Sequence, residues 1–156
     1  MKHINWNTTL NRRLAFITVL LLVIFFIEKK LTVVFTESIN ATILWRTAET
    51  PNKGDYANYA LDKKHTKGRH LVITKKVQCV EGDMLVVRGK DYYCNGQWLG
   101  TAKEKTLKGK PLVAFQWSGI VPEGKVFFMG EHKDSWDSRY WGFAKLTDTE
   151  KVNKII

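Results

Sequence analysis

The chain of 156 residues carries 25 Lys and Arg against 15 Asp and Glu, a formal net charge of +10. This length suits one modest domain with an appendage rather than several domains. A basic balance is typical of proteins that contact nucleic acid or an anionic membrane surface. The lysines are scattered over the chain and no nucleic-acid-binding motif is present, so we expect membrane lipid rather than nucleic acid as a partner.

Residues 1–35 predict a short cytoplasmic tail followed by a transmembrane anchor. Residues 14–27 are apolar except for Thr18, and a helix of this length covers about 21 Å of the roughly 30 Å hydrocarbon core. Three interpretations are open: a cleaved signal peptide, a buried core helix and an uncleaved anchor. A cleavable signal requires small residues after the apolar run and a core helix usually has a polar face, and neither feature is present. We therefore favour an uncleaved single span.

The charges that flank this span favour a cytoplasmic N-terminus. Arg12 and Arg13 precede the apolar run, although Lys29 and Lys30 after it reduce the asymmetry. We therefore expect a single-pass protein of the cytoplasmic (inner) membrane. Its main domain, residues 36–156, is then expected on the periplasmic side.

The pattern after the anchor changes to short β-strands separated by turn residues. Asn95-Gly96 is typical of a tight hairpin, here between residues 92–94 and 97–99. Other expected strands are residues 31–35, 71–74, 77–80, 84–87 and 126–129. No helical pattern of useful length follows residue 35, and residues 103–110 are expected to form an exposed charged loop. The sequence thus predicts one mainly β domain, a barrel or folded sheet.

Residues 130–142 mix three acids, an Arg, a His, two Ser and three aromatics between two glycines. The glycines suggest backbone that turns or is approached closely. An Asp two residues before an Arg, with Ser on both sides of that Asp, indicates a locally tied polar network. On composition alone, a surface loop anchored by aromatics is an equally good interpretation.

These residues resemble the last signature box of the type I signal peptidases, G-D-N-x-x-x-S-x-D-S-R-Y-W-G. The match from Ser135 onward has no gap, while Glu131 replaces the usual Asp and His132 the usual Asn. Residues 121–130 resemble the lead-in V-P-x-G-x-x-F-x-x-G. The resemblance implies a signal-peptidase-like β-domain behind one transmembrane helix.

The resemblance also supplies a candidate nucleophile and base. Ser38 follows the anchor, as the Ser of the family's S-M-x-P does, although the Pro is absent here; Gly54-Asp55 is similar to the later G-D-x-V. Residues 75–83 resemble K-R-V-x-x-x-x-G-D, with Lys75 in the position of the catalytic Lys. Alone, Lys75 and Lys76 would be interpreted as a solvated strand end. A base for Ser must be neutral, so the Lys pKa must fall from about 10.4 towards 7–8, and the apolar neighbours of Lys75 offer the burial that this requires.

The resemblance implies a Ser-Lys dyad that needs no metal or cofactor. Ser38 is the nucleophile and Lys75 the base. The oxyanion is held by the backbone N–H of Ser38 and the hydroxyl of Thr36. The supporting residues that the resemblance implies are Ser135, which orients the Lys, and the ion pair of Asp137 and Arg139.

The small size and single anchor make the chain most similar to the conjugative-transfer signal peptidases of the TraF type, which process pilin. We therefore predict a serine endopeptidase that acts on a pilin or signal-peptide-bearing precursor. A transpeptidase that cyclises pilin through the same acyl-enzyme is the alternative within enzymes. An inactive membrane-tethered scaffold is the rival from another class.

The two cysteines, Cys79 and Cys94, show no metal-binding spacing. Two buried free thiols in a β core would be common. We expect a disulfide, because the topology places both outside the cytoplasm and the strands between them can fold back. Closing a loop of this size is worth about 3 kcal/mol in the chain-entropy model.

Overall fold

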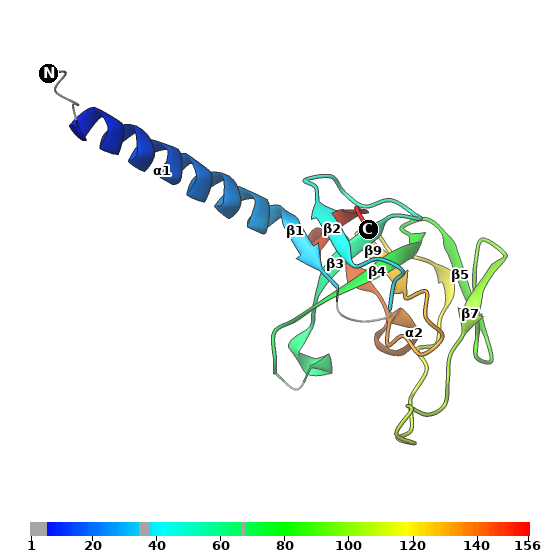
Figure 1. Cartoon of the computed structure of the whole chain (residues 1–156). Helices are drawn as coiled ribbons and strands as arrows, with labels where there is room; N and C mark the ends of the chain where they lie inside the picture. The colour runs from blue at the N-terminus through cyan, green and yellow to red at the C-terminus, as the bar shows by residue number, and fades with distance from the viewer. Residues whose placement is uncertain (1–5, 35–37, 67) are drawn as a thin grey trace, which may run out of the picture. The chain divides into compact units, whose positions relative to one another are not determined.

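A computed structural model describes residues 6–34, 38–66 and 68–156 of the chain (Figure 1). Residues 1–31 and 32–156 form two compact units. The first unit is built around one helix and the second around two antiparallel sheets. The prediction of a mainly β domain is therefore confirmed.

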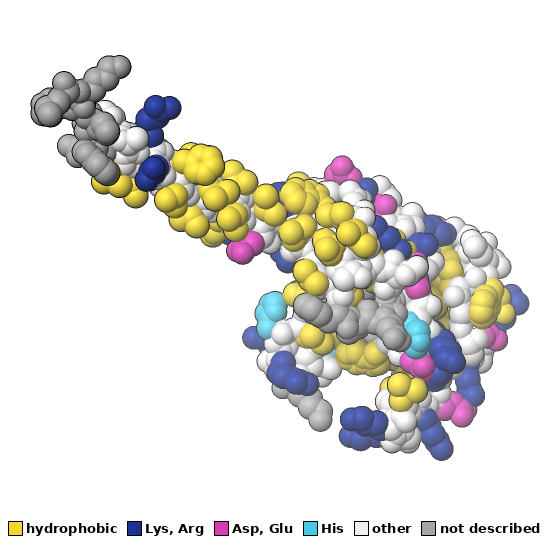
Figure 2. Space-filling view, viewed as in Figure 1, with side chains coloured by type: hydrophobic (Ala, Val, Ile, Leu, Met, Phe, Trp, Pro, Cys, Tyr) yellow, Lys and Arg dark blue, Asp and Glu magenta, His cyan; other side chains and the backbone are white. Residues whose placement is uncertain are grey.

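Helix α1 spans Trp6–Lys30, so the helical segment extends beyond both ends of the apolar run seen in the sequence. Thr8–Lys30 is long and apolar enough to cross a membrane, with a mean hydropathy of 2.1. Apolar side chains cover the visible face of this helix (Figure 2), and its described side chains are exposed. The helix is thus compatible with a single-pass membrane anchor and is not a buried core helix.

The larger sheet has seven strands in the order β1-β2-β11-β3-β4-β9-β10. Its strands are β1 (Leu31–Val33), β2 (Ile43–Arg46), β3 (Tyr56–Leu61), β4 (Leu71–Val80), β9 (Lys125–Met129), β10 (Ala144–Lys145) and β11 (Thr149–Lys154). Figure 1 shows β3, β4 and β9 side by side, and each neighbouring pair is antiparallel. The centre of this sheet therefore joins the consecutive strands β3 and β4 to β9, which lies far from both in the sequence.

The smaller sheet has four strands in the order β7-β6-β5-β8. Its strands are β5 (Met84–Arg88), β6 (Asp91–Cys94), β7 (Gln97–Thr101) and β8 (Ser118–Ile120). The predicted hairpin is confirmed, because Cys94 pairs with Gln97 and both loop residues, Asn95 and Gly96, have positive φ. Two positive φ angles match the twist of the flanking strands.

Several strands differ from those expected from the sequence. Residues 71–74 and 77–80 form one continuous strand, β4, because Lys75 and Lys76 stay in the ladder despite their charge. β2, β3, β8, β10 and β11 were not anticipated. Helical structure after residue 35 is limited in the described residues to short turns: α2 (Ser138–Trp141), η1 (Lys63–His65) and η2 (Leu146–Asp148).

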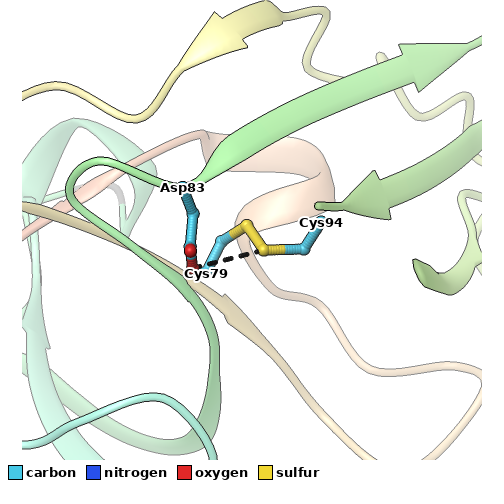
Figure 3. Close-up of side chains that lie close together, drawn as sticks. All are labelled: Cys79, Asp83 and Cys94. Atoms are coloured by element: carbon cyan, nitrogen blue, oxygen red, sulfur yellow. Dashed lines mark hydrogen bonds between the residues drawn. A yellow bond between two sulfur atoms is a disulfide. The ribbon is translucent and has the colours of Figure 1, made fainter. Parts of the chain in front are cut away.

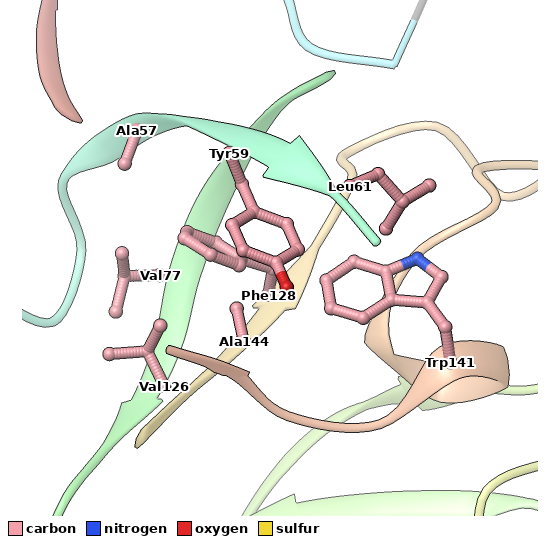
Figure 4. Packing of buried hydrophobic residues seen from close by; sticks show 8 residues of the cluster. All are labelled: Ala57, Tyr59, Leu61, Val77, Val126, Phe128, Trp141 and Ala144. Atoms are coloured by element: carbon pink, nitrogen blue, oxygen red, sulfur yellow. The ribbon is translucent and has the colours of Figure 1, made fainter. Parts of the chain in front are cut away.

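One buried cluster lies on the large sheet and includes Trp141 of α2 (Figure 4). Its members are Ala57, Tyr59, Leu61, Val77, Val126, Phe128, Trp141 and Ala144. The rings of Tyr59 and Trp141 stack with centroids 5.5 Å apart. Removing a buried aromatic of this kind costs about 3–5 kcal/mol, so the cluster holds α2 firmly against β3. The segment 130–142 is fixed by this packing at its C-terminal end.

Candidate active site

Lys75 lies on β4, between β3 and β9. Ala57 is opposite Lys75 on β3, and Met129 is opposite Lys76 on β9. Continuing the β4–β9 register by one residue sets Lys75 opposite Gly130, which directly follows β9. Residues directly opposite in antiparallel strands point to the same face. The Lys75 side chain thus lies on the face where a side chain at Gly130 would lie.

The Lys75 side chain is buried, since the residue is only 4% exposed. Burial disfavours the charged ammonium and lowers the pKa of Lys75 from 10.5 to about 8. The negative charge of Asp137 opposes this change, and the positive charge of Arg139 adds to it. A larger fraction of Lys75 is therefore neutral near pH 7 than of an ordinary lysine. This is the protonation state that a base requires.

Gly130 is the point where the candidate residues meet. A Cβ atom at this position would stand 2.0 Å from the Ser135 Oγ and 2.9 Å from the carbonyl oxygen of Ser38. The expectation that a glycine here permits a close approach is thus confirmed. Because the Ser135 hydroxyl fills the place of a Gly130 side chain, it lies on the same face as Lys75.

The Ser135 hydroxyl is buried and makes no hydrogen bond with the described residues. A buried hydroxyl without a partner is costly, and its retention points to a role that packing does not explain. It lies on the face that carries Lys75, and no hydrogen bond joins the two side chains in the described residues. The orientation of Lys75 by Ser135 therefore stays a prediction.

Ser38 is half-buried and lies between β1 and β2. Its carbonyl oxygen accepts a hydrogen bond of 2.7 Å from the backbone N–H of Glu131. Ser38, Ser135 and Lys75 are thus brought to the same end of β9. Thr36, the second candidate oxyanion donor, lies outside the described residues.

Asp137 and Arg139 form a buried ion pair, as the polar network in the sequence indicated. Asp137 is 0% and Arg139 3% exposed, and two contacts of 2.8 Å join the guanidinium to both carboxylate oxygens. Arg139 also donates to the carbonyl oxygens of Thr101 and Ser135, at 2.8 and 3.3 Å. Asp137 caps α2 by accepting from the N–H of Arg139. Such bidentate contacts hold the segment in one geometry.

Sequence reasoning missed the role of Ser138. This residue is fully buried, and its Oγ accepts a hydrogen bond of 2.9 Å from the N–H of Phe128. The bond ties the start of α2 to β9. Its place beside Asp137 in the matched box was the available signal, but nothing in the sequence separated a structural hydroxyl from a catalytic one.

Two pockets border residues 130–136. One, of about 540 Å³, is lined by residues of β7 together with Met129–Lys133 and Arg139. The other, of about 480 Å³, lies between Ser135-Trp136 and residues 105–110, the exposed part of the loop expected at 103–110. Both are large enough for side chains of a bound peptide.

The predicted disulfide is present between Cys79 of β4 and Cys94 of β6, with Cα atoms 6.0 Å apart (Figure 3). It links the large sheet to the small one, and both residues are buried. Asp83 lies close to both sulfur atoms, and the three side chains together could suggest a metal site. Because both sulfurs are bonded to each other, they offer no thiolate to a metal.

Comparison with known proteins identifies the family. The family model described as "Signal peptidase, peptidase S26" matches residues 7–153. A signal peptidase I of Bacillus caldolyticus is 31% identical over 83 residues, which cover 46% of this chain and 46% of that protein, so the match spans about half the length of the relative. A crystal structure of a signal peptidase I from Enterococcus faecalis V583 is 24% identical, with a TM-score of 0.46, over 69% of this chain and 100% of the other. Since the family match covers nearly the whole chain, the protein belongs to the S26 signal peptidase family.

Proposed function

We propose that this chain is a membrane-anchored serine endopeptidase in which Ser38 is the nucleophile and Lys75 the base. The observation that carries the proposal is the burial of Lys75 opposite Gly130, with its pKa lowered to about 8. A lysine with that pKa accepts a proton near neutral pH, which an exposed lysine does not. Family membership and the meeting of Ser38 and Ser135 at Gly130 support the assignment.

The reaction would proceed through an acyl-enzyme. The Ser38 hydroxyl gives its proton to the neutral Lys75 amine as Oγ bonds to the scissile carbonyl carbon. The Lys75 ammonium passes this proton to the leaving amine when the C–N bond breaks. Water then attacks the Ser38 ester, gives a proton to Lys75, and Ser38 Oγ recovers its proton as the ester breaks.

The remaining candidate residues would support these steps. The backbone N–H of Ser38 and the hydroxyl of Thr36 would stabilise the oxyanion, and one such donor is typically worth about 3–4 kcal/mol of barrier. Ser135 would orient the Lys75 amine by hydrogen bonding. The buried pair of Asp137 and Arg139 would fix Ser135 through the guanidinium contact to its carbonyl oxygen.

The substrate would be a membrane-inserted pilin or signal-peptide-bearing precursor, in a conjugative transfer system of the TraF type. Helix α1 would anchor the enzyme in the cytoplasmic membrane, with the catalytic domain, residues 36–156, on the periplasmic side. Anchoring enzyme and substrate in one bilayer raises their effective concentration, which suits a substrate presented at the membrane surface.

The same acyl-enzyme admits a second outcome. If the amine at the other end of the cleaved pilin attacks the Ser38 ester, a new peptide bond forms and the product is a ring. Hydrolysis and cyclisation differ only in the nucleophile that reaches the ester. An inactive scaffold would need neither the Ser38 hydroxyl nor a neutral Lys75.

Replacement of Ser38 by alanine in the full chain tests the proposal. We expect Ser38→Ala to abolish precursor processing in a mating strain, whereas Ser118→Ala on the exposed edge of β8 should process normally. Mass spectrometry of the pilin separates the outcomes, because a ring is one water lighter than the cut chain. Unchanged processing by Ser38→Ala would favour the scaffold.

A further inference from the structure

Glu131 contacts the segment of the candidate nucleophile from two sides. Its backbone N–H donates to the carbonyl oxygen of Ser38 at 2.7 Å, and its carboxylate Oε2 accepts from the N–H of Asn40 at 2.7 Å. The two bonds bracket Ile39, whose side chain is buried at 3% exposure. The backbone from Ser38 to Asn40 is thus held at both ends by a single residue.

The Glu131 side chain is itself held from two neighbouring strands of the large sheet. The Tyr56 hydroxyl at the start of β3 donates to Oε1. The Lys154 ammonium on β11 lies 3.8 Å from Oε2 and 4.4 Å from the centroid of the Tyr56 ring. These contacts come from paired strands, so they give the carboxylate a rigid support.

The contacts also keep Glu131 ionised. Burial alone would raise its pKa, but the hydrogen bonds from Asn40 and Tyr56, with the charges of Lys154 and Lys76, hold the pKa below its usual value. An ionised carboxylate accepts shorter and stronger hydrogen bonds than a neutral group. The bond to the Asn40 N–H is therefore present throughout the neutral range.

We propose that Glu131 is a positioning residue that sets the backbone of Ser38 for attack, through the paired bonds to Ser38 and Asn40. The inference rests on the proposed peptidase function and extends it. Glu131 also departs from the family box, which usually has Asp here, and the longer side chain makes the contacts to both Asn40 and Tyr56. Aspartate is shorter by one methylene, about 1.5 Å, and would not reach Asn40 and Tyr56 together.

The expected kinetic effect is on the chemical step. Loss of the bond at Asn40 frees the nucleophile segment, which acts on the chemical step, so kcat should fall while KM stays nearly constant. A misplacement of about 1 Å can cost about a hundredfold in rate. We expect Glu131→Ala to lower kcat about tenfold to a hundredfold and to change KM less than about twofold.

The test uses the full chain in detergent with an internally quenched peptide that carries an Ala-x-Ala cleavage site. Glu131→Gln keeps an acceptor for Asn40 and a partner for Tyr56, so its kcat should recover to within about fivefold of the parent. Glu131→Asp should remain as slow as Glu131→Ala. The matched control is Glu104→Ala, which removes an exposed carboxylate paired with Lys90. If Glu131→Ala does not fold, the comparison of Glu131→Gln with Glu131→Asp decides. A higher kcat for Glu131→Gln is expected, and a higher kcat for Glu131→Asp would contradict the proposal.

A second measurement separates this inference from the peptidase assignment. Amide hydrogen exchange of Asn40 should accelerate at least about tenfold in Glu131→Ala, whatever the activity. If the parent protein cleaves the peptide but Glu131→Ala has the same kcat and the same Asn40 exchange rate as the parent, the positioning role is overturned and the peptidase function stands. A parent protein without Ser38-dependent cleavage would overturn the peptidase function, and the exchange result would still decide whether Glu131 holds the segment.

Discussion

The carboxylate of Asp137 accepts a hydrogen bond of 2.9 Å from the backbone N–H of Gly130. The same carboxylate binds Arg139, so one buried acid links the end of β9 to α2. Gly130 is in turn followed by Glu131, whose N–H binds the carbonyl oxygen of Ser38. Asp137 therefore sets the position of the strand end at which the candidate residues meet.

Replacing Asp137 by asparagine should strongly destabilise the protein. Arg139 is 3% exposed and would keep its charge in a buried site without a counter-ion. Breaking a buried pair in this way costs about 3–5 kcal/mol. Denaturant unfolding of the full chain checks this value, with the exposed Glu104→Gln expected to change stability by less than about 0.5 kcal/mol. Equal effects of the two changes would contradict the structural role of the ion pair.

Gly130→Ala should displace Ser135. The new methyl group would stand 2.0 Å from the Ser135 Oγ, and overpacking of this kind typically costs about 1–3 kcal/mol. The double change Gly130→Ala with Ser135→Gly should recover part of the thermal stability, because the clashing hydroxyl is gone, but it should not recover cleavage. A single Gly130→Ala variant with the parent melting temperature would show that the two residues are not in contact.

Lys75→Met should stabilise the protein while abolishing cleavage. A folded-state pKa of about 8 against 10.5 in the unfolded chain disfavours the charged form by about 3 kcal/mol. Between about pH 8 and 10.5 the folded protein binds fewer protons than the unfolded chain, so the parent gains stability as pH rises through this interval. Below about pH 8 the destabilisation from the buried Lys75 charge is fully present. Urea unfolding at pH 7 and 10.5 should thus show a stability gain for Lys75→Met that shrinks at the higher pH. A gain that is constant with pH would contradict the lowered pKa.

The Cys79–Cys94 disulfide should leave no thiol to alkylate in the folded, unreduced protein. The double change Cys79→Ala and Cys94→Ala should lower the free energy of unfolding by about 3 kcal/mol, for a sequence separation of 15. Labelling with a thiol reagent before and after reduction provides the measurement. Two thiols that react without reduction would contradict the bridge.

The sequence predicted the features whose signal is local. The Asn95-Gly96 hairpin follows from backbone preferences of the two residues, and α1 follows from a continuous apolar run. The pairing of Cys79 with Cys94 needed only that the intervening strands fold back. These elements depend on residues close together in the chain, so one sequence was sufficient.

Features that depend on long-range pairing were not predictable. β11 pairs with both β2 and β3, across about a hundred residues, and its polar sequence carries no clear strand alternation. Lys75 and Lys76 divided the expected strand, although β4 runs through them. The contact between Gly130 and Ser135, and the reach of Glu131 to Asn40, required coordinates. Resemblance to the family proposed the residues of the site, and the register of β4 with β9 supplied their physical relationship.

The pH dependence of peptide cleavage tests the central claim most directly, since it reports the protonation state of the proposed base. Only neutral Lys75 accepts the Ser38 proton, and the pKa of Lys75 is lowered to about 8. We expect kcat/KM to rise about tenfold per pH unit from pH 6 and to level near pH 8. We expect no cleavage by Lys75→Arg, because the arginine stays protonated. A flat profile between about pH 6 and 10, or an active Lys75→Arg enzyme, would contradict it.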